Sequence, residues 1–268
     1  MTDNLAHLAQ IKCFLFDMDG TINLGDTLIS GMEGFFAALK ERGRKYYLVT
    51  NNSSRGHAHY AAKMNRLGVP VTEDEILISS DALVSWLDKH QGTRSLFVLG
   101  TGELKDFLIE KGYKLIDNVN ESCDYVVVGF DQTLTYAKLA TACRLIDRGV
   151  PYVATHPDVR CPVEGGEYIP DTGAMLELIR AATGREVKLI FGKPYRYMVD
   201  VVLERTGFKR SEIAMVGDRL STDIAFGLNN RILSVLVLTG EATMDDVRSG
   251  RVRPDIILNH AKEILQYI

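Results

Sequence analysis

Short apolar runs that each end in small polar or charged residues constrain this chain more than any other feature. The first, from Lys12 to Phe16, stops at Asp17 and Asp19, which are one residue apart and are followed by a glycine and a threonine. If this run is a buried strand, both aspartates lie just beyond its carboxyl end, where ligands bind in open α/β sheets. Because side chains alternate along an extended chain, the two carboxylates would point the same way. An Asp-Gly turn after a strand is the alternative interpretation.

Two carboxylates that converge repel each other unless a cation or a proton lies between them, and Mg²⁺ suits such oxygen ligands. A later apolar run, from Ile213 to Val216, ends in Gly217 and Asp218. Asp218 can complete a carboxylate metal site. Asp223 follows near the start of a helix, where it either orients another ligand or is an ordinary acid of the first helical turn.

Two further strand ends carry groups suited to an anion. The run from Tyr46 to Val49 is followed by Thr50 and Asn51, whose hydroxyl and backbone N–H can hold phosphate oxygens. Serines just beyond them can also cap the next helix. Lys193 follows a third apolar run and offers a compact positive charge, although a lone lysine is more often a solvated surface residue.

Taken together, these motifs resemble those of the haloacid dehalogenase superfamily of hydrolases. The chain is most similar to the NagD subfamily, whose relatives include 4-nitrophenyl and pyridoxal-phosphate phosphatases. The resemblance rests on residues 17–21, 49–53, 192–194 and 216–223, and it covers nearly the whole chain. It implies an aspartyl-phosphate intermediate and Mg²⁺ as cofactor.

The resemblance also assigns roles to the motif residues. Asp17 would be the nucleophile, and Asp19 would act as general acid and then as general base. Thr50, Asn51 and Lys193 would hold the phosphoryl group. The implied metal ligands are Asp17, Asp218 and Asp19, the last through its backbone carbonyl, with Asp223 behind them.

The chemistry is consistent with these roles. A carboxylate is an established nucleophile toward phosphoryl groups, and Mg²⁺ and a lysine would neutralise the charge of a phosphate monoester. In the family, phosphatases carry an aspartate two residues after the nucleophile and dehalogenases do not, and this chain has Asp19 there. We therefore expect hydrolysis of small phosphate monoesters such as sugar phosphates or nucleoside monophosphates. The alternatives are a phosphate-binding or regulatory protein without useful turnover, and a phosphomutase.

The composition narrows the class of protein. The chain has 268 residues, of which 46% are hydrophobic, so a substantial core is available. The net charge of -4 does not support nucleic-acid binding, and no apolar run reaches the roughly 18 residues of a membrane span. Four scattered cysteines and the lack of a signal-peptide pattern favour reduced thiols and a cytoplasmic location. We expect a small phosphate ester as the partner, no nucleic acid and no membrane, and we leave a homodimer open.

Strand-like and helical patterns alternate along the chain, which is typical of an α/β protein with a doubly wound parallel sheet. The catalytic motifs lie outside the middle of the chain, which has strand and helix patterns of its own. We therefore predict a Rossmann-like catalytic core over residues 1–80 and 187–268, and an inserted α/β cap domain of the family's C2 type over 81–186. The expected strands are 12–16, 46–49, 213–216, 234–238, 95–99, 125–128 and 152–154. The expected helices are 32–41, 57–67, 196–205, 222–228, 103–110, 136–148 and 173–182.

Two segments of the insert have more than one interpretation. The glycines at 100 and 102 follow a strand like the start of a dinucleotide fingerprint, but the third glycine is missing, so we predict a structural turn. A loop rich in proline and glycine runs from His156 to Gly173 and resembles the family's substrate-specificity loop. Its candidate residues are His156, Asp158 and Asp171. The alternative for His156, which we favour, is a histidine whose hydrogen bonds are satisfied within the loop.

Overall fold

The computed structural model describes residues 5–90, 92, 94–163 and 166–268, and the chain divides into two compact units. The first comprises Met1–Thr50, His57–Leu77 and Lys193–Ile268, and the second comprises Asn51–Gly56 and Ile78–Gly192. The second unit thus starts and ends within a few residues of the insert predicted over 81–186. It also takes a short segment from the motif around Thr50, a division that the sequence pattern did not indicate.

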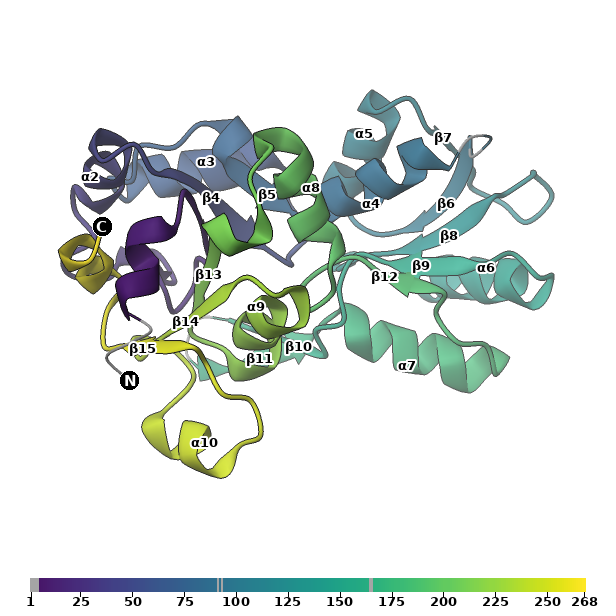
Figure 1. Cartoon of the computed structure of the whole chain (residues 1–268). Helices are drawn as coiled ribbons and strands as arrows, with labels where there is room; N and C mark the ends of the chain where they lie inside the picture. The colour runs from purple at the N-terminus through teal and green to yellow at the C-terminus, as the bar shows by residue number, and fades with distance from the viewer. Residues whose placement is uncertain (1–4, 91, 93, 164–165) are drawn as a thin grey trace. The chain divides into compact units, whose positions relative to one another are not determined.

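A six-stranded sheet forms the centre of the first unit (Figure 1). From β1 the strand order runs to β4 and β5 in one direction and to β13, β14 and β15 in the other. The order therefore reverses between β1 and β13, which pair in parallel with Phe16 opposite Val216. Such a reversal point is where doubly wound sheets bind ligands. The strands are β1 (Cys13–Phe16), β4 (Lys45–Thr50), β5 (Ile76–Ile78), β13 (Ile213–Gly217), β14 (Leu233–Val237) and β15 (Ile256–Leu258).

The helices of the first unit follow the predicted pattern with two exceptions, of which one is an unpredicted helix over Met244–Ser249. A π-helical turn, Leu220–Ile224, precedes α9, whereas a single helix was expected over 222–228. The hydrophobic core includes an aromatic group in which Phe16 of β1 packs edge-on against Phe35 and Phe36 of α2. This packing anchors the strand that ends at Asp17. The helices are α2 (Phe35–Glu41), α3 (His57–Arg66), α8 (Tyr197–Thr206), α9 (Ala225–Asn230) and α10 (Met244–Ser249).

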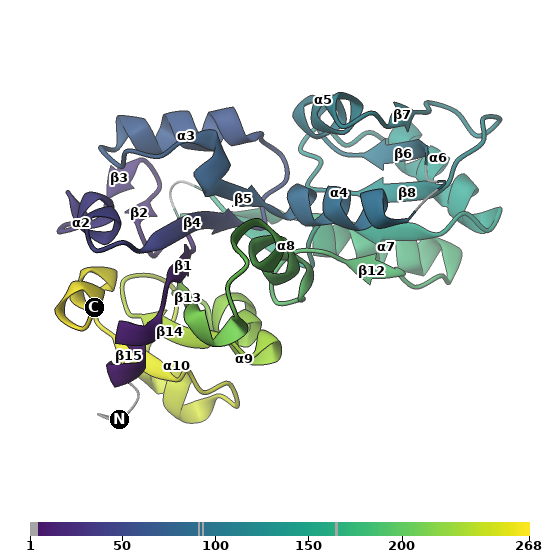
Figure 2. The same cartoon turned by 45° about the horizontal axis from the view of Figure 1, so that its top comes forward.

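A small hairpin that the sequence did not predict follows Asp19. It pairs β2 (Asn23–Leu24) with β3 (Thr27–Leu28) in antiparallel fashion. The turn contains Gly25 at φ 57°, a backbone conformation that glycine adopts at little cost. Figure 2 shows this hairpin close to α3, and an ion pair between α3 and Asp19 agrees with that placement.

The second unit contains a parallel sheet of its own, in the order β12-β9-β8-β6-β7. Figure 1 shows α4 and α5 on one side of this sheet and α6 and α7 on the other, so the predicted α/β class holds for both units. Apolar side chains of α6 and α7 form one core cluster with those of the strands. The strands are β6 (Ser95–Leu99), β7 (Lys114–Leu115), β8 (Tyr125–Val128), β9 (Tyr152–Ala154) and β12 (Leu189–Ile190). The helices are α4 (Ser79–Lys89), α5 (Gly102–Glu110), α6 (Tyr136–Asp147) and α7 (Thr172–Thr183).

Two local predictions in the second unit can be judged directly. The glycine-containing turn at 100–102 is structural, because the Thr101 side chain caps α5 by accepting a hydrogen bond from the Leu104 N–H. The segment from His156 to Gly173 is not an irregular loop throughout. It contains an antiparallel hairpin, β10 (Arg160–Pro162) with β11 (Tyr168–Pro170), which the glycine and proline content concealed.

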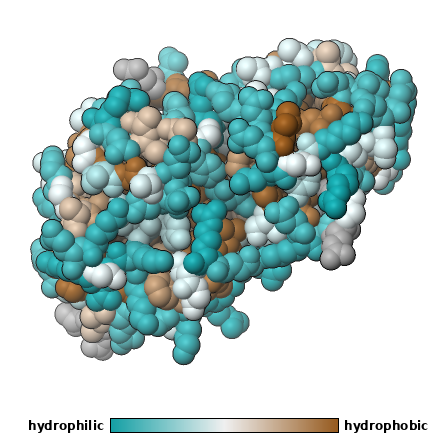
Figure 3. All heavy atoms as spheres, turned by 90° about the horizontal axis from the view of Figure 1, so that it is seen from above, coloured by the Kyte–Doolittle hydropathy of each residue, from teal (hydrophilic) through white to brown (hydrophobic). Residues whose placement is uncertain are grey.

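Polar side chains cover most of the face displayed in Figure 3, and apolar side chains appear there in small groups. None of the described helices has both the length and the apolar character that crossing a membrane demands. All four cysteines are free thiols. The buried charged residues Lys193, Asp218 and Asp223 have no simple explanation and indicate a functional site.

Candidate active site

The site of the first unit starts from two adjacent strands. Asp17 directly follows β1, and its backbone N–H donates to the Val216 carbonyl at 2.9 Å, so the register with β13 continues past Phe16. Asp218 directly follows β13. Because parallel strands end at the same edge of the sheet, the two aspartates come together although they are far apart in sequence.

Lys193 connects two of the acids. Its Nζ lies 2.6 Å from Asp17 Oδ1 and 2.6 Å from Asp223 Oδ1, and its side chain is only 3% exposed. Burial alone would lower the pKa of Lys193, but the adjacent carboxylates outweigh it and raise that pKa above the ordinary value. The interpretation of Lys193 as a solvated surface residue is therefore wrong, because its amine is buried between two carboxylates.

Asp223 is fully buried and is not an ordinary acid of the first helical turn. Its Oδ1 accepts from Lys193, and its Oδ2 accepts from the Arg219 backbone N–H at 3.1 Å. Gly217 permits this arrangement, because a Cβ at that position would overlap the Asp223 side chain. Burial raises the pKa of Asp223, Lys193 opposes the shift, and the charges of Asp17 and Asp218 add to it.

Asp218 lies in a cradle of backbone. Its Oδ2 accepts from the Glu241 backbone N–H at 2.7 Å, and a Cβ on either Gly20 or Gly240 would overlap its carboxylate. Burial, and after it the charge of Asp17, raises the pKa of Asp218. Ligand oxygens of Asp17, Asp218 and Asp223 all lie within 4.8 Å of one another, so the three acids are close enough to share one cation. Hard divalent cations prefer such an all-oxygen set.

Asp19 lies apart from these three acids. Its side chain is 56% exposed and makes contact with Asn23 and Lys63 instead. Partial burial raises the pKa of Asp19, Lys63 opposes that shift and Asp17 adds to it. Neither Asn23 nor Lys63 was singled out from the sequence. For Asn23, a polar residue between the apolar Ile22 and Leu24 was a usable signal. For Lys63, nothing in the local sequence distinguishes it from other lysines on helices.

The phosphate-binding candidates at the end of β4 divide between the units. Thr50 is buried and belongs to the first unit, whereas Asn51 belongs to the second. The Asn51 side chain donates to both carboxylate oxygens of Asp158 at 3.2 Å, and its backbone carbonyl accepts from the Ser79 hydroxyl. The role in phosphate binding stays a prediction for both residues.

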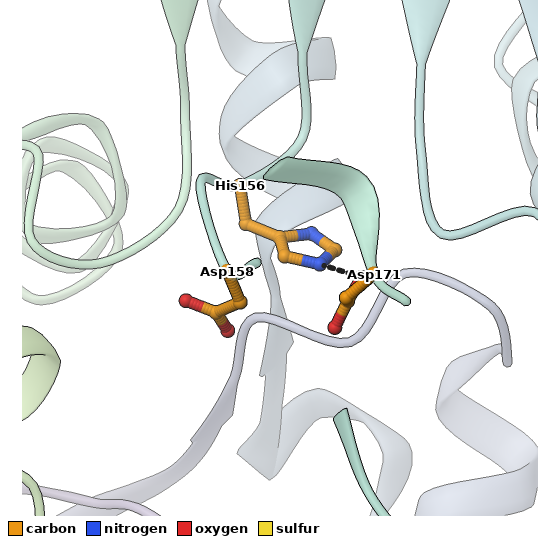
Figure 4. A group of neighbouring side chains, drawn as sticks. All are labelled: His156, Asp158 and Asp171. Carbon is orange, nitrogen blue, oxygen red and sulfur yellow. Dashed lines mark hydrogen bonds and ion pairs between the residues drawn. The ribbon is translucent and has the colours of Figure 1, made fainter. Parts of the chain in front are cut away.

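The second unit also contains a buried charged group, shown in Figure 4. His156, which is 0% exposed, has its Nε2 2.8 Å from Asp171 Oδ1 and its Nδ1 2.9 Å from the Thr155 hydroxyl. Asp171 also caps α7 by accepting from the Thr172 backbone N–H. Burial lowers the pKa of His156, but the hydrogen bond and charge of Asp171 reverse the shift and raise it overall.

His156, Asp158 and Asp171 are also close enough together to hold a metal ion. However, both ring nitrogens and both carboxylates already have hydrogen-bond partners within the unit. This geometry agrees with the interpretation of His156 as a histidine whose hydrogen bonds are satisfied. A role of the three residues in substrate selection stays a prediction.

Known proteins place the chain in a family. Residues 14–114 match the family described as haloacid dehalogenase-like hydrolase, and residues 190–264 match the one described as HAD-hydrolase-like. An acid sugar phosphatase of Staphylococcus aureus is 34% identical over 92% of this chain and 94% of its own. The chain belongs to the haloacid dehalogenase-like hydrolases. Its resemblance to the NagD branch is also confirmed, since a solved structure described as a NagD protein is 42% identical.

Solved structures of other haloacid dehalogenase-like hydrolases have the same fold. The 4-nitrophenylphosphatase of Thermotoga maritima is 41% identical and superposes with a TM-score of 0.92, covering 97% of this chain and 98% of that one. The glycerol phosphate phosphatase of Mycobacterium tuberculosis, in complex with magnesium, is 29% identical with a TM-score of 0.87, covering 96% and 78%. The predicted enzyme class is confirmed: this hydrolase is a phosphatase that acts on phosphoric monoesters.

Proposed function

We propose that this phosphatase works through a phosphoryl group carried covalently on Asp17. The observation that carries the proposal is the position of Lys193, a buried ammonium group in contact with Asp17 and Asp223. A phosphate monoester is repelled by a carboxylate nucleophile. A charged lysine fixed beside that nucleophile offsets the repulsion without any reorganisation.

The proposed reaction has two steps. In the first, an Asp17 oxygen attacks phosphorus, the bond from phosphorus to the leaving oxygen breaks, and Asp19 donates a proton to that oxygen. In the second, Asp19 takes a proton from water, the water oxygen attacks phosphorus, and the bond to Asp17 breaks to release phosphate. Thr50, Asn51 and Lys193 hold the phosphoryl oxygens in both steps.

The acids of the first unit fit Mg²⁺, and we propose it as the cofactor. The carboxylates of Asp17 and Asp218 and the backbone carbonyl of Asp19 would hold the ion. When bound, Mg²⁺ supplies the positive charge that three clustered acids and a phosphate require. The backbone cradle around Asp218 supports this role. Asp223, which accepts from Lys193 and the Arg219 N–H, is proposed to orient the lysine rather than to bind the ion.

The proposed substrates are small phosphate esters: sugar phosphates, nucleoside monophosphates or similar compounds. The names of the relatives, which include an acid sugar phosphatase and a glycerol phosphate phosphatase, support this class. We propose that His156, Asp158 and Asp171 of the second unit select among leaving groups, as a cap domain would. A cytoplasmic location is proposed from the free thiols, and a homodimer stays open.

A panel of phosphate esters, assayed for phosphate release with Mg²⁺ and with EDTA, tests the proposal. We expect turnover with Mg²⁺, loss with EDTA, and incorporation of phosphate into wild type but not into Asp17→Asn under acid quench. Tight binding of an ester without phosphate release would instead favour the binding-protein alternative. An isomerised ester as the product would favour the phosphomutase.

A further inference from the structure

Two donors approach the same oxygen of the Asp19 carboxylate. Asn23 Nδ2 donates to Asp19 Oδ1 at 2.6 Å, and Lys63 Nζ lies 3.6 Å from that same atom. Lys63 comes from α3 and is 17% exposed, whereas Asn23 is fully buried at the start of β2. Within the described part of the chain, the Asp19 side chain makes no hydrogen bond other than the one from Asn23.

The orientation of the Asn23 amide is fixed by its surroundings. Nδ2 donates to the Gly25 carbonyl at 2.8 Å as well as to Asp19, so a flipped amide would point its oxygen at two acceptors. As a consequence, Asn23 Oδ1 is buried and has no hydrogen-bond partner among the described residues. Leaving a buried acceptor unpaired lowers the stability of the fold. We therefore attribute the orientation of the Asn23 amide to the hydrogen bond that its nitrogen donates to Asp19.

The backbone around Asn23 is also fixed relative to Asp19. The Gly20 N–H donates to the Asn23 carbonyl at 2.7 Å, and the Asn23 N–H donates to the Met18 carbonyl at 3.2 Å. The β2–β3 hairpin then holds Asn23 opposite Leu28. A side chain presented from such a closed turn can hold its neighbour in one orientation, as a support for a reacting group must.

We propose that Asn23 and Lys63 are positioning residues for Asp19. Because Oδ1 accepts from an amide and faces an ammonium group, Oδ2 is the oxygen left without a hydrogen-bond partner among the described residues, and we assign to it the transfer of the proton to the leaving group. This inference rests on the proposed role of Asp19 as general acid. As the ester bond breaks, its electron pair goes to the leaving oxygen, and that oxygen takes the proton from Oδ2. Lys63 stabilises the resulting carboxylate through its charge.

Lys63 could instead bind the substrate directly. If Lys63 positions Asp19, its removal lowers activity most for esters whose leaving group needs a proton. If Lys63 binds the substrate, its removal lowers activity most for esters that carry an additional negative charge. The two roles therefore predict different dependence on the leaving group.

The experiment compares kcat/KM for two esters, 4-nitrophenyl phosphate and glycerol phosphate, in Lys63→Met, Lys63→Arg and Asn23→Leu. The parameter kcat/KM reports the steps up to departure of the leaving group, so later hydrolysis of the covalent intermediate does not enter. General acids contribute roughly 10²- to 10⁴-fold, so losing part of that contribution in Lys63→Met should lower kcat/KM for glycerol phosphate about tenfold more than for 4-nitrophenyl phosphate. Lys63→Arg should retain most of the wild-type kcat/KM for glycerol phosphate. Lys12→Met, which removes an ion pair with Glu212, should lower neither.

Equal losses on both esters in Lys63→Met would overturn the inference, and so would a larger loss on 4-nitrophenyl phosphate than on glycerol phosphate. Asp19→Asn separates this inference from the proposed function. If Asp19→Asn lowers kcat/KM equally for the two esters, the general-acid role of Asp19 is wrong. If Asp19→Asn lowers kcat/KM more for glycerol phosphate but Lys63→Met does not, only the positioning role fails. Lys63 lies on a helix surface, so its variants remain informative if Asn23→Leu does not fold.

Discussion

Each unit of this phosphatase carries a group of clustered charged side chains, but the two groups differ in charge balance. In the first unit, Asp17, Asp218 and Asp223 lie together, and the buried Lys193 contacts two of them, Asp17 and Asp223. In the second, the acids of the His156 group are paired with hydrogen-bond donors from the same unit. The first group has more carboxylates than positively charged partners, so it can bind a further cation. In the second group, each carboxylate has a hydrogen-bond donor within the unit. Burial of charge alone therefore does not identify the reactive centre, and the unbalanced charge does.

The largest expected effect is that of Asp17→Asn. The amide is a poor nucleophile and a weaker metal ligand, so we expect phosphate release to fall by about 10⁴-fold or more. The measurement is kcat for release of phosphate in a preparation whose fold is checked by circular dichroism. Activity within tenfold of wild type would refute the assignment of Asp17.

Lys193→Met should reduce both activity and stability. Loss of the charge beside Asp17 should cost about 10²- to 10³-fold in kcat. Leaving two buried carboxylates without their partner should destabilise the fold by about 3–5 kcal/mol, measured by denaturant titration.

The comparison variant is Lys138→Met in the second unit, where Lys138 pairs with the buried Asp131. It should lower stability while leaving kcat near that of wild type. If Lys138→Met lowers kcat as much as Lys193→Met does, the charge beside Asp17 has no special role in catalysis.

Loss of the Asp218 carboxylate should weaken the binding of Mg²⁺. For Asp218→Asn we expect the Mg²⁺ concentration that gives half-maximal activity to rise at least about tenfold, because one anionic ligand is gone. Thermal stabilisation by Mg²⁺ should shrink in parallel, which is a readout that does not depend on turnover. Asp131→Asn, the loss of a buried acid in the other unit, should change neither. An unchanged Mg²⁺ dependence in Asp218→Asn would show that the acids bind no ion.

The smallest effect concerns the pH dependence of stability in the second unit. The folded pKa of His156 is raised above the 6.5 of an unperturbed histidine. Between those two values the folded state binds more protons than the unfolded state, so its stability falls as pH rises. The contribution of His156 is complete below about pH 6.5 and is lost as pH rises through the folded pKa.

His156→Asn should remove this dependence. We expect its thermal midpoint to differ from that of wild type more at pH 5.5 than at pH 9. A difference between His156→Asn and wild type that is independent of pH would indicate that His156 is buried as a neutral ring.

Much of the fold and of the first charged group follows from local sequence. The strands ending at Phe16, Thr50 and Gly217 are continuous apolar runs, and the residues that stop them are the chemical groups of the site. In the second unit, the strands β6, β8 and β9 and the helices α5, α6 and α7 match predicted ranges closely because their apolar periodicity is regular, whereas α4, β7 and β12 were not predicted. The hairpin β10–β11 was missed because its short strands alternate weakly and lie among prolines and glycines. The π-helical turn before α9 was also missed, and Asp223 within it contacts both Lys193 and the Arg219 backbone N–H.

The sequence by itself determined which kinds of group stand at the strand ends, since an apolar run followed by Asp, Thr or Lys is a local pattern. Only the tertiary structure decided which of them meet. Lys193 reaches Asp17 across 176 residues of sequence, and Asn51 reaches Asp158 across 107. Lys63 reaches Asp19 from α3, 44 residues further along the chain. Such pairings arise from strand order and helix packing, which bring together residues that share no local pattern, and they decide which charges are balanced and which are left to bind a ligand.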